Sequence, residues 1–297
     1  MNHTPALRRG LTAAIAAYVC WGLLPLYFRA LHAVPPFELV GWRVVFTVPV
    51  CLVIIAVRKQ AAEVFAALKN PRVLGQLALS AGLIGANWLI YVMAINSGHV
   101  LATSLGYYIN PLINVLLGTM LLGERLSRVQ WAAVALAGLG IALLLAGALD
   151  TLAIALSLAF TFAFYGFVRK QAPVSSVPGL TVETALLLLP AIMIVFLASE
   201  SPQGSSLGKD DSDTLLLLAS GIATAVPLLL FAVAARAMPL STLGFVQFLA
   251  PTISFVLGLT VFGETLDNTR LACFALIWAA IALYSWDMLR RSGQAPA

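Results

Sequence analysis

Runs of about twenty apolar residues recur along this chain and restrict its fold more than any other feature. A helix of about that length crosses the hydrocarbon core of a bilayer. Because no water bonds to exposed peptide groups there, only helices and closed barrels span membranes. Ten such runs are present, at 11–31, 37–57, 73–94, 100–121, 130–148, 151–168, 181–198, 214–235, 241–262 and 270–288. We therefore predict an all-α integral membrane protein with ten transmembrane helices.

The composition excludes a soluble domain. Apolar residues make up 61% of the chain and charged residues 10%, whereas soluble domains are roughly half apolar and a quarter charged. The links between the apolar runs are short, and the one sizeable polar link, 200–213, is predicted to be a flexible surface segment.

The distribution of basic residues predicts the orientation in the membrane. Ten spans place both termini on the same side. That side then carries thirteen of the basic residues: Arg8, Arg9, Arg58, Lys59, Lys69, Arg72, Arg125, Arg128, Arg169, Lys170, Arg236, Arg290 and Arg291. Only three lie on the other side, Arg29, Lys209 and Arg270. Since Lys and Arg are concentrated in cytoplasmic loops, both termini are predicted to be cytoplasmic. The net charge of +5 therefore reflects topology and not a nucleic-acid partner.

Two of the apolar runs resemble each other around a proline. Residues 109–126 read INPLINVLLGTMLLGERL, and residues 249–266 read LAPTISFVLGLTVFGETL. The proline, isoleucine, both glycines, the glutamate and a leucine recur at a constant offset of 140 residues, which pairs Pro111 with Pro251. A proline inside a membrane helix can be a simple kink. Matched prolines in two related halves instead predict helices broken around a transport site.

This repeat divides the chain into two five-helix units, predicted at 7–148 and 149–291. Because five is odd, the second unit crosses the membrane in the opposite sense to the first. The expected architecture is therefore two inverted repeats around a central cavity, with Pro111 and Pro251 breaking the helices that frame it.

Polar side chains at membrane depth are the best indicators of a cavity, because each is costly in hydrocarbon. Arg43 lies inside the second apolar run, where its charge would suit a carboxylate or another electron-rich group of a ligand. A structural alternative is pairing with Glu38 or with the carbonyls at a helix C-terminus. We expect Arg43 to act as an anion anchor.

Amide and aromatic side chains on neighbouring spans complete the predicted site. Asn87 and Asn110 are expected to donate hydrogen bonds to a ligand, with Gln247 on the same cavity. The alternative for these amides is hydrogen bonding between helices, worth about 0.6–2 kcal/mol in membranes, and we prefer it for Asn114. The predicted binding residues are Arg43, Asn87, Trp88, Asn110, Trp21, Tyr107 and Gln247.

Several chemistries lack their motifs. The sequence contains no phosphate-binding loop, no metal-spaced His/Cys/acid cluster and no nucleophile motif, so we expect no cofactor, no metal and no enzymatic activity. Glu183 is the nearest candidate for a coupling proton, but an acid near a helix N-terminus is also favoured by the helix dipole. The coupling ion and the oligomeric state stay open, as does a second reading, a membrane receptor or regulatory subunit that binds a metabolite without moving it.

The chain resembles the EamA-like transporters of the drug/metabolite transporter superfamily, and within them the RarD group. The resemblance is carried by AAYVCWGLLPLYF (16–28), the stretch from Glu38 to Arg43, GANWLIYVMAIN (85–96), SLGYYINPLINVLLG (104–118), LGERL (122–126), AFYGFVRK (163–170), TAVPLLLF (224–231) and LSTLGFVQFLAPT (240–252). It implies ten helices in a bacterial inner membrane and export of a small metabolite, an amino acid or a drug. The group's usual His-Arg pair is Trp42-Arg43 in this chain, which retains the arginine but not the histidine.

Overall fold

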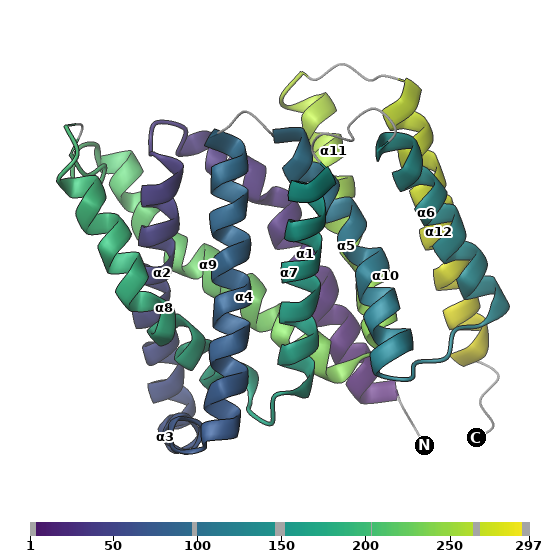
Figure 1. Ribbon diagram of the computed structural model, residues 1–297, viewed down its shortest axis with the longest axis horizontal. Coiled ribbons are helices and arrows are strands. Elements are labelled where there is room, and N and C mark those ends of the chain that lie inside the picture. Colours follow the sequence, from purple (N-terminus) through teal and green to yellow (C-terminus); the bar gives the residue numbers. More distant parts are fainter. Residues whose placement is uncertain (1–3, 97–99, 146–151, 203, 264–267, 293–297) are drawn as a thin grey trace.

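The computed structural model describes residues 4–96, 100–145, 152–202, 204–263 and 268–292. Within these ranges the regular structure is entirely helical (Figure 1). The helices are α1 (Thr4–Ala30), α2 (Pro36–Arg58), α3 (Ala61–Lys69), α4 (Pro71–Asn96), α5 (Val100–Leu121), α6 (Arg128–Leu145), α7 (Leu152–Gln171), α8 (Ser176–Ser199), α9 (Asp211–Ala237), α10 (Leu240–Gln247), α11 (Leu249–Thr260) and α12 (Asn268–Ser292).

Eight segments of the described chain are long and apolar enough to cross a membrane. They are α1, α2, α4, α7, α8, α9, α12 and the segment Leu240–Thr260 that holds α10 and α11. The all-α membrane fold is thereby confirmed. The predicted count of ten spans is not confirmed, because α5 is not among the eight and the apolar part of α6, Arg128–Leu143, is shorter.

The predicted break at a proline occurs in one of the two related segments only. Between α10 and α11 the helix is interrupted at Phe248. Pro251 accounts for this break, because it lacks the N–H that would bond to the carbonyl four residues earlier, at Gln247. In contrast, α5 continues through Pro111, so the expectation of a broken helix there is wrong. A membrane helix tolerates such a proline where its neighbours accommodate the freed carbonyl.

Helices from the first half of the chain pack mainly against helices from the second half. The extensive pairs are α1 with α9, α2 with α8 and α9, α4 with α7, α5 with α7 and α10, α6 with α12, and α1 with α11. The start of α1 and the end of α12 lie at the same end of the molecule, which also carries α3 on its other side (Figure 1). The two halves are therefore interleaved and do not form separate bodies.

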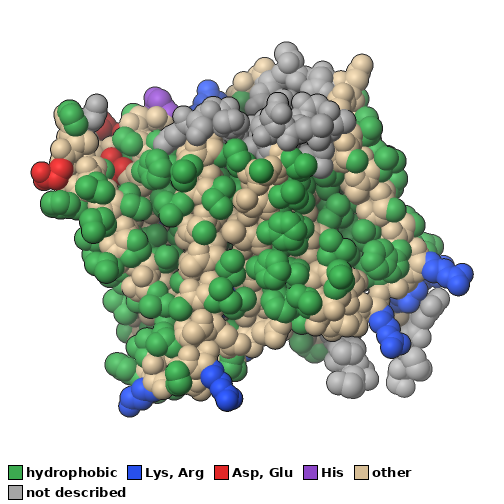
Figure 2. Space-filling view, viewed as in Figure 1, with side chains coloured by type: hydrophobic (Ala, Val, Ile, Leu, Met, Phe, Trp, Pro, Cys, Tyr) green, Lys and Arg blue, Asp and Glu red, His purple; other side chains and the backbone are tan. Residues whose placement is uncertain are grey.

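The surface matches a protein surrounded by lipid. Hydrophobic side chains cover the sides of the helices in Figure 2, whereas most Lys and Arg gather at the end that carries α3 and the end of α12. Large apolar side chains such as Val57 and Leu189 are 76% and 75% exposed. Such exposure of apolar surface is expected where the solvent is hydrocarbon.

The polar link between α8 and α9 is anchored and not the free surface segment that the sequence suggested. The buried carboxylate of Glu38, in the first turn of α2, accepts hydrogen bonds from the Ser205 hydroxyl at 2.7 Å and from the backbone amide of Ser206 at 2.7 Å. The Ser206 hydroxyl donates to the same carboxylate at 2.8 Å. Together these bonds hold the link against the start of α2.

Candidate functional site

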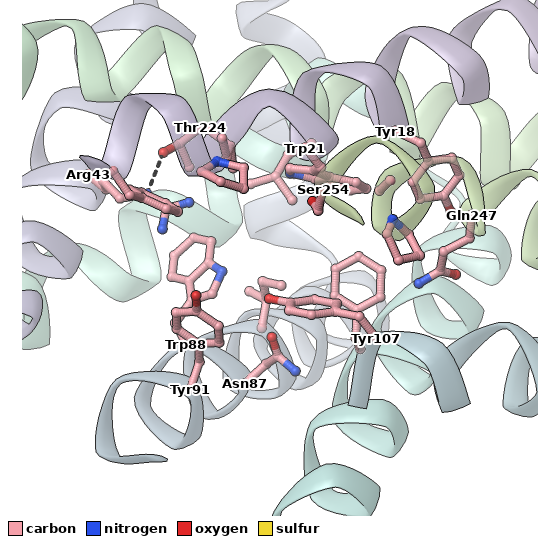
Figure 3. A pocket seen from close by; sticks show the side chains of 18 of the residues that line it. Tyr18, Trp21, Arg43, Asn87, Trp88, Tyr91, Tyr107, Thr224, Gln247 and Ser254 are labelled. Carbon is pink, nitrogen blue, oxygen red and sulfur yellow. Dashed lines mark hydrogen bonds between the residues drawn. The ribbon is translucent and has the colours of Figure 1, made fainter. Parts of the chain in front are cut away.

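A cavity of about 270 Å³ lies among helices of both halves of the chain (Figure 3). Its walls include the later parts of α1 and α4 and the first part of α2, so it lies in the half of the molecule away from the start of α1. Seven of the nine residues predicted for the site line it: Trp21, Arg43, Asn87, Trp88, Tyr107, Gln247 and Pro251. Asn110 and Pro111 do not.

Arg43 brings a positive charge into this cavity from α2. Its Nε donates to the Thr224 hydroxyl at 3.0 Å, and its guanidinium carbon lies 5.3 Å from the ring centre of Trp88 and 5.6 Å from that of Phe28. Figure 3 shows both terminal nitrogens on the cavity side. Among the described residues no acid pairs with Arg43. One structural alternative, pairing with Glu38, does not occur, since that carboxylate bonds to Trp42 and to the link before α9.

Asn87 presents an acceptor to the cavity and not the donor that the sequence suggested. Its Nδ2 donates to the backbone carbonyl of Leu158 at 2.8 Å and to the Thr161 hydroxyl at 2.9 Å, both on α7. A backbone carbonyl can only accept, so the nitrogen must face α7. The oxygen of Asn87 then faces the cavity, as Figure 3 shows.

Asn110 lies outside the cavity and orients a residue inside it. Its Nδ2 donates to the carbonyl of Ala159 at 2.8 Å, which leaves its oxygen to accept from Asn114 Nδ2 at 3.1 Å. The same nitrogen of Asn114 donates to Gln247 Oε1 at 2.8 Å. The Ala159 carbonyl can only accept, so it determines the orientation of each amide in this series of bonds. The oxygen of Gln247 therefore faces Asn114, and its Nε2 faces the cavity, as Figure 3 shows. The prediction that Asn110 donates to a ligand is therefore corrected, and the preference for helix–helix bonding at Asn114 is confirmed.

Aromatic rings form much of the cavity wall. Trp21, Trp88 and Tyr107 all line it, as the sequence suggested, although their role toward a ligand stays a prediction. The Tyr91 and Tyr107 rings lie 6.2 Å apart, and Figure 3 shows both hydroxyls directed inward. Flat apolar surfaces therefore lie between the charged end at Arg43 and the amide end at Gln247.

The sequence prediction missed two lining residues that contact Arg43. Phe28 lies seven residues after Trp21 on α1, and this helical spacing could have placed both on one face. Thr224 gave no such signal, because a lone threonine in an apolar helix usually bonds to its own backbone. Only the packing of α2 against α9 brings it to Arg43.

An aromatic cluster separates the cavity from a buried ion pair. It consists of Trp21, Phe162, Tyr165 and Phe231, whose ring centres lie 5.3 to 6.0 Å from their neighbours. Trp21 and Phe162 line the cavity, and Tyr165 lies one helical turn before Arg169 on α7.

Arg169 and Glu183 are each 1% exposed, with Nε and Oε1 3.5 Å apart. The Ser80 hydroxyl also donates to Glu183. Since α8 begins at Ser176, Glu183 lies two turns inside its helix and not one, and its partners are side chains and not the helix N-terminus.

The chain is similar over most of its length to a known protein family and to several known proteins. A model of the EamA-like transporter family matches residues 8–146 and again residues 150–286. Protein RarD of Escherichia coli strain K12 is 42% identical over 283 residues, which cover 95% of each chain. An uncharacterized transporter of Pseudomonas aeruginosa is 45% identical over 295 residues, 99% of this chain and 98% of that protein. A solved crystal structure aligns with a TM-score of 0.74 over 93% of this chain and 97% of the other, at 20% identity, which shows a shared fold.

Proposed function

The chain belongs to the EamA-like transporter family and is close to the RarD proteins, and on this premise we propose that it is a secondary transporter for a small organic solute. The solute is a metabolite or drug, with amino-acid-like compounds as the first candidates. Transport runs outward across the bacterial inner membrane by alternating access, as the resemblance to the superfamily implies.

One observation carries this proposal above the others: an arginine without an acidic partner among the described residues faces a cavity between the two halves of a membrane protein. On insertion scales an arginine at the centre of a membrane helix costs about 2.5–3.5 kcal/mol. Such residues mark substrate and ion pathways, because the interaction with a ligand offsets the cost.

The pattern of helix packing supports an inverted-repeat architecture of ten spans. In such an architecture, α1, α2, α4, α5 and α6 of the first half would correspond, in that order, to α7, α8, α9, α10–α11 and α12 of the second half. Replacing each helix of a packed pair by its counterpart should then give another packed pair. The pair α1–α9 then corresponds to α4–α7, α2–α9 to α4–α8, and α5–α7 to α1–α11, and all of these pairs pack. Secondary transporters commonly place their sites at the interface of such repeats.

The charge distribution supports cytoplasmic termini. Most of the Lys and Arg visible in Figure 2 lie at the end of the molecule that holds the start of α1 and the end of α12 (Figures 1 and 2). With that end in the cytoplasm, the cavity lies in the outer half of the membrane and the aromatic cluster lies below it.

Efflux from proteoliposomes tests the proposal. Vesicles loaded with a panel of amino acids and small drugs, without ATP, are compared for the wild type and Arg43→Ala. Arg29→Ala is the matched control, because Arg29 donates to the carbonyl of Val261 and does not line the cavity. We expect loss of one solute class, abolished by Arg43→Ala and retained by Arg29→Ala. Retention of every solute by folded wild-type protein would contradict transport and favour a metabolite receptor.

A further inference from the structure

The cavity has a defined set of unused hydrogen-bonding groups. At one end, Arg43 uses only its Nε among the described residues, so the paired terminal nitrogens of the guanidinium are available. Among the residues that the structure describes, no Asp or Glu lines the cavity. A guanidinium binds a carboxylate with two parallel hydrogen bonds, the geometry these two nitrogens offer. An amine would meet a like charge here with no acid to compensate it.

The opposite end offers donors as well. Gln247 must turn its Nε2 inward, because its oxygen accepts from Asn114. A ligand that reaches this end therefore needs an acceptor, or it leaves a nearly buried amide unpaired, which costs about 1–3 kcal/mol. Asn87 differs from both ends, since it offers an acceptor oxygen from the side wall.

The middle of the cavity favours a flat apolar body. Trp21, Trp88 and Tyr107 surround it with aromatic surface, which packs well on planar groups. Its volume of about 270 Å³ is just below the usual range of ligand pockets, about 300–1,000 Å³. Arg43 is the one Lys or Arg among the described lining residues, so the described part of the cavity balances a single negative charge.

We propose that this cavity binds a small monocarboxylate with a flat apolar body and a hydrogen-bond acceptor at its far end, and that it rejects cationic amines that carry no carboxylate. The inference deepens the proposed function, since it takes the same cavity as the transport site, but binding can be measured whether or not transport occurs.

A series of ligands that differ mainly in charge tests the Arg43 end. Binding of 3-phenylpropanoate, 3-phenylpropanamide and 3-phenylpropylamine to the purified protein is followed by tryptophan fluorescence, since Trp21 and Trp88 line the cavity. We expect the carboxylate to bind about ten- to a hundredfold more tightly than the amide, and the amine not to bind. Arg43→Gln should remove the difference between carboxylate and amide, while Arg29→Gln keeps it. Equal affinity for all three ligands in the wild type overturns the proposal, so the test does not depend on a variant that folds poorly.

A second pair of ligands tests the Gln247 end. We expect 3-(4-acetylphenyl)propanoate to bind about five- to tenfold more tightly than 3-(4-ethylphenyl)propanoate, and Gln247→Leu to abolish this preference. Equal binding of the two by the wild type would refute the acceptor requirement. Carboxylate binding without efflux would uphold this inference and refute transport. Efflux of amines but not of carboxylates would do the opposite.

Discussion

Replacing Glu183 by leucine should destabilise the protein more than replacing Arg169 by methionine, although each change removes the same ion pair. Both side chains are 1% exposed, so whichever charge remains stays buried. An arginine left alone keeps its charge, because it cannot be deprotonated in proteins. A glutamate left alone can take up a proton, and Glu183 retains its hydrogen bond from Ser80.

The structure gives the size of the effect. At the observed 3.5 Å, two unit charges attract by about 5 kcal/mol for an effective dielectric constant of about 20. Removing one partner of a buried pair typically costs about 3–5 kcal/mol, and we expect this cost for Glu183→Leu. Arg169→Met should cost about 1–3 kcal/mol, comparable to an unsatisfied buried polar group. The double variant should be close to wild type, because apolar replacement of both partners is often neutral.

Thermal unfolding in detergent at neutral pH measures this order. The midpoint temperature of unfolding should be highest for the wild type and the double variant, lower for Arg169→Met and lowest for Glu183→Leu. Lowering the pH should raise the midpoint of Arg169→Met, because protonated Glu183 is the form that its site tolerates without a partner. If the losses of the two single variants simply add in the double variant, the pair is not coupled and the reasoning is refuted.

Two further substitutions have expected outcomes that the structure defines. Gly221→Ala should prevent accumulation of folded protein, because a Cβ there would overlap the backbone carbonyl of Phe46 where α9 meets α2. Gly82→Ala is its matched control, since a Cβ there meets nothing within 4 Å, and this change should leave the stability unchanged or raise it by up to about 1 kcal/mol. Size-exclusion chromatography of the two variants measures the difference. A normal elution profile for Gly221→Ala would contradict the close packing of α9 on α2. Glu124→Gln should lower the midpoint of thermal unfolding, because the Glu124 carboxylate accepts a hydrogen bond from the backbone amide of Ser241 at 2.9 Å. Hydrogen bonds to charged groups are worth about 1.5–3 kcal/mol. An unchanged midpoint would show that this bond contributes nothing to stability.

Much of the fold was predictable because the requirement for a membrane span is local. Apolar runs of sufficient length indicated the helices without knowledge of their neighbours. The position of Arg43 was informative for a similar reason, since a charge at membrane depth is costly wherever the partner helices lie.

The details of the site were not predictable, because they depend on which groups the neighbouring helices supply. Asn87 presents its oxygen to the cavity because its nitrogen donates to the Leu158 carbonyl. The two prolines are a second example, because similar local sequences give a continuous helix at Pro111 and an interrupted one before Pro251. Local sequence alone does not distinguish these two outcomes.

Efflux through a Ser254→Trp protein tests most directly whether solute passes through the cavity between the two halves. Ser254 lines the cavity, so a tryptophan there should fill it and abolish efflux of the solute that the wild type transports. Leu189→Trp is the control, because Leu189 is 75% exposed on the outer side of α8 and its replacement should leave efflux intact. Undiminished efflux through folded Ser254→Trp protein would contradict the assignment of this cavity as the transport pathway.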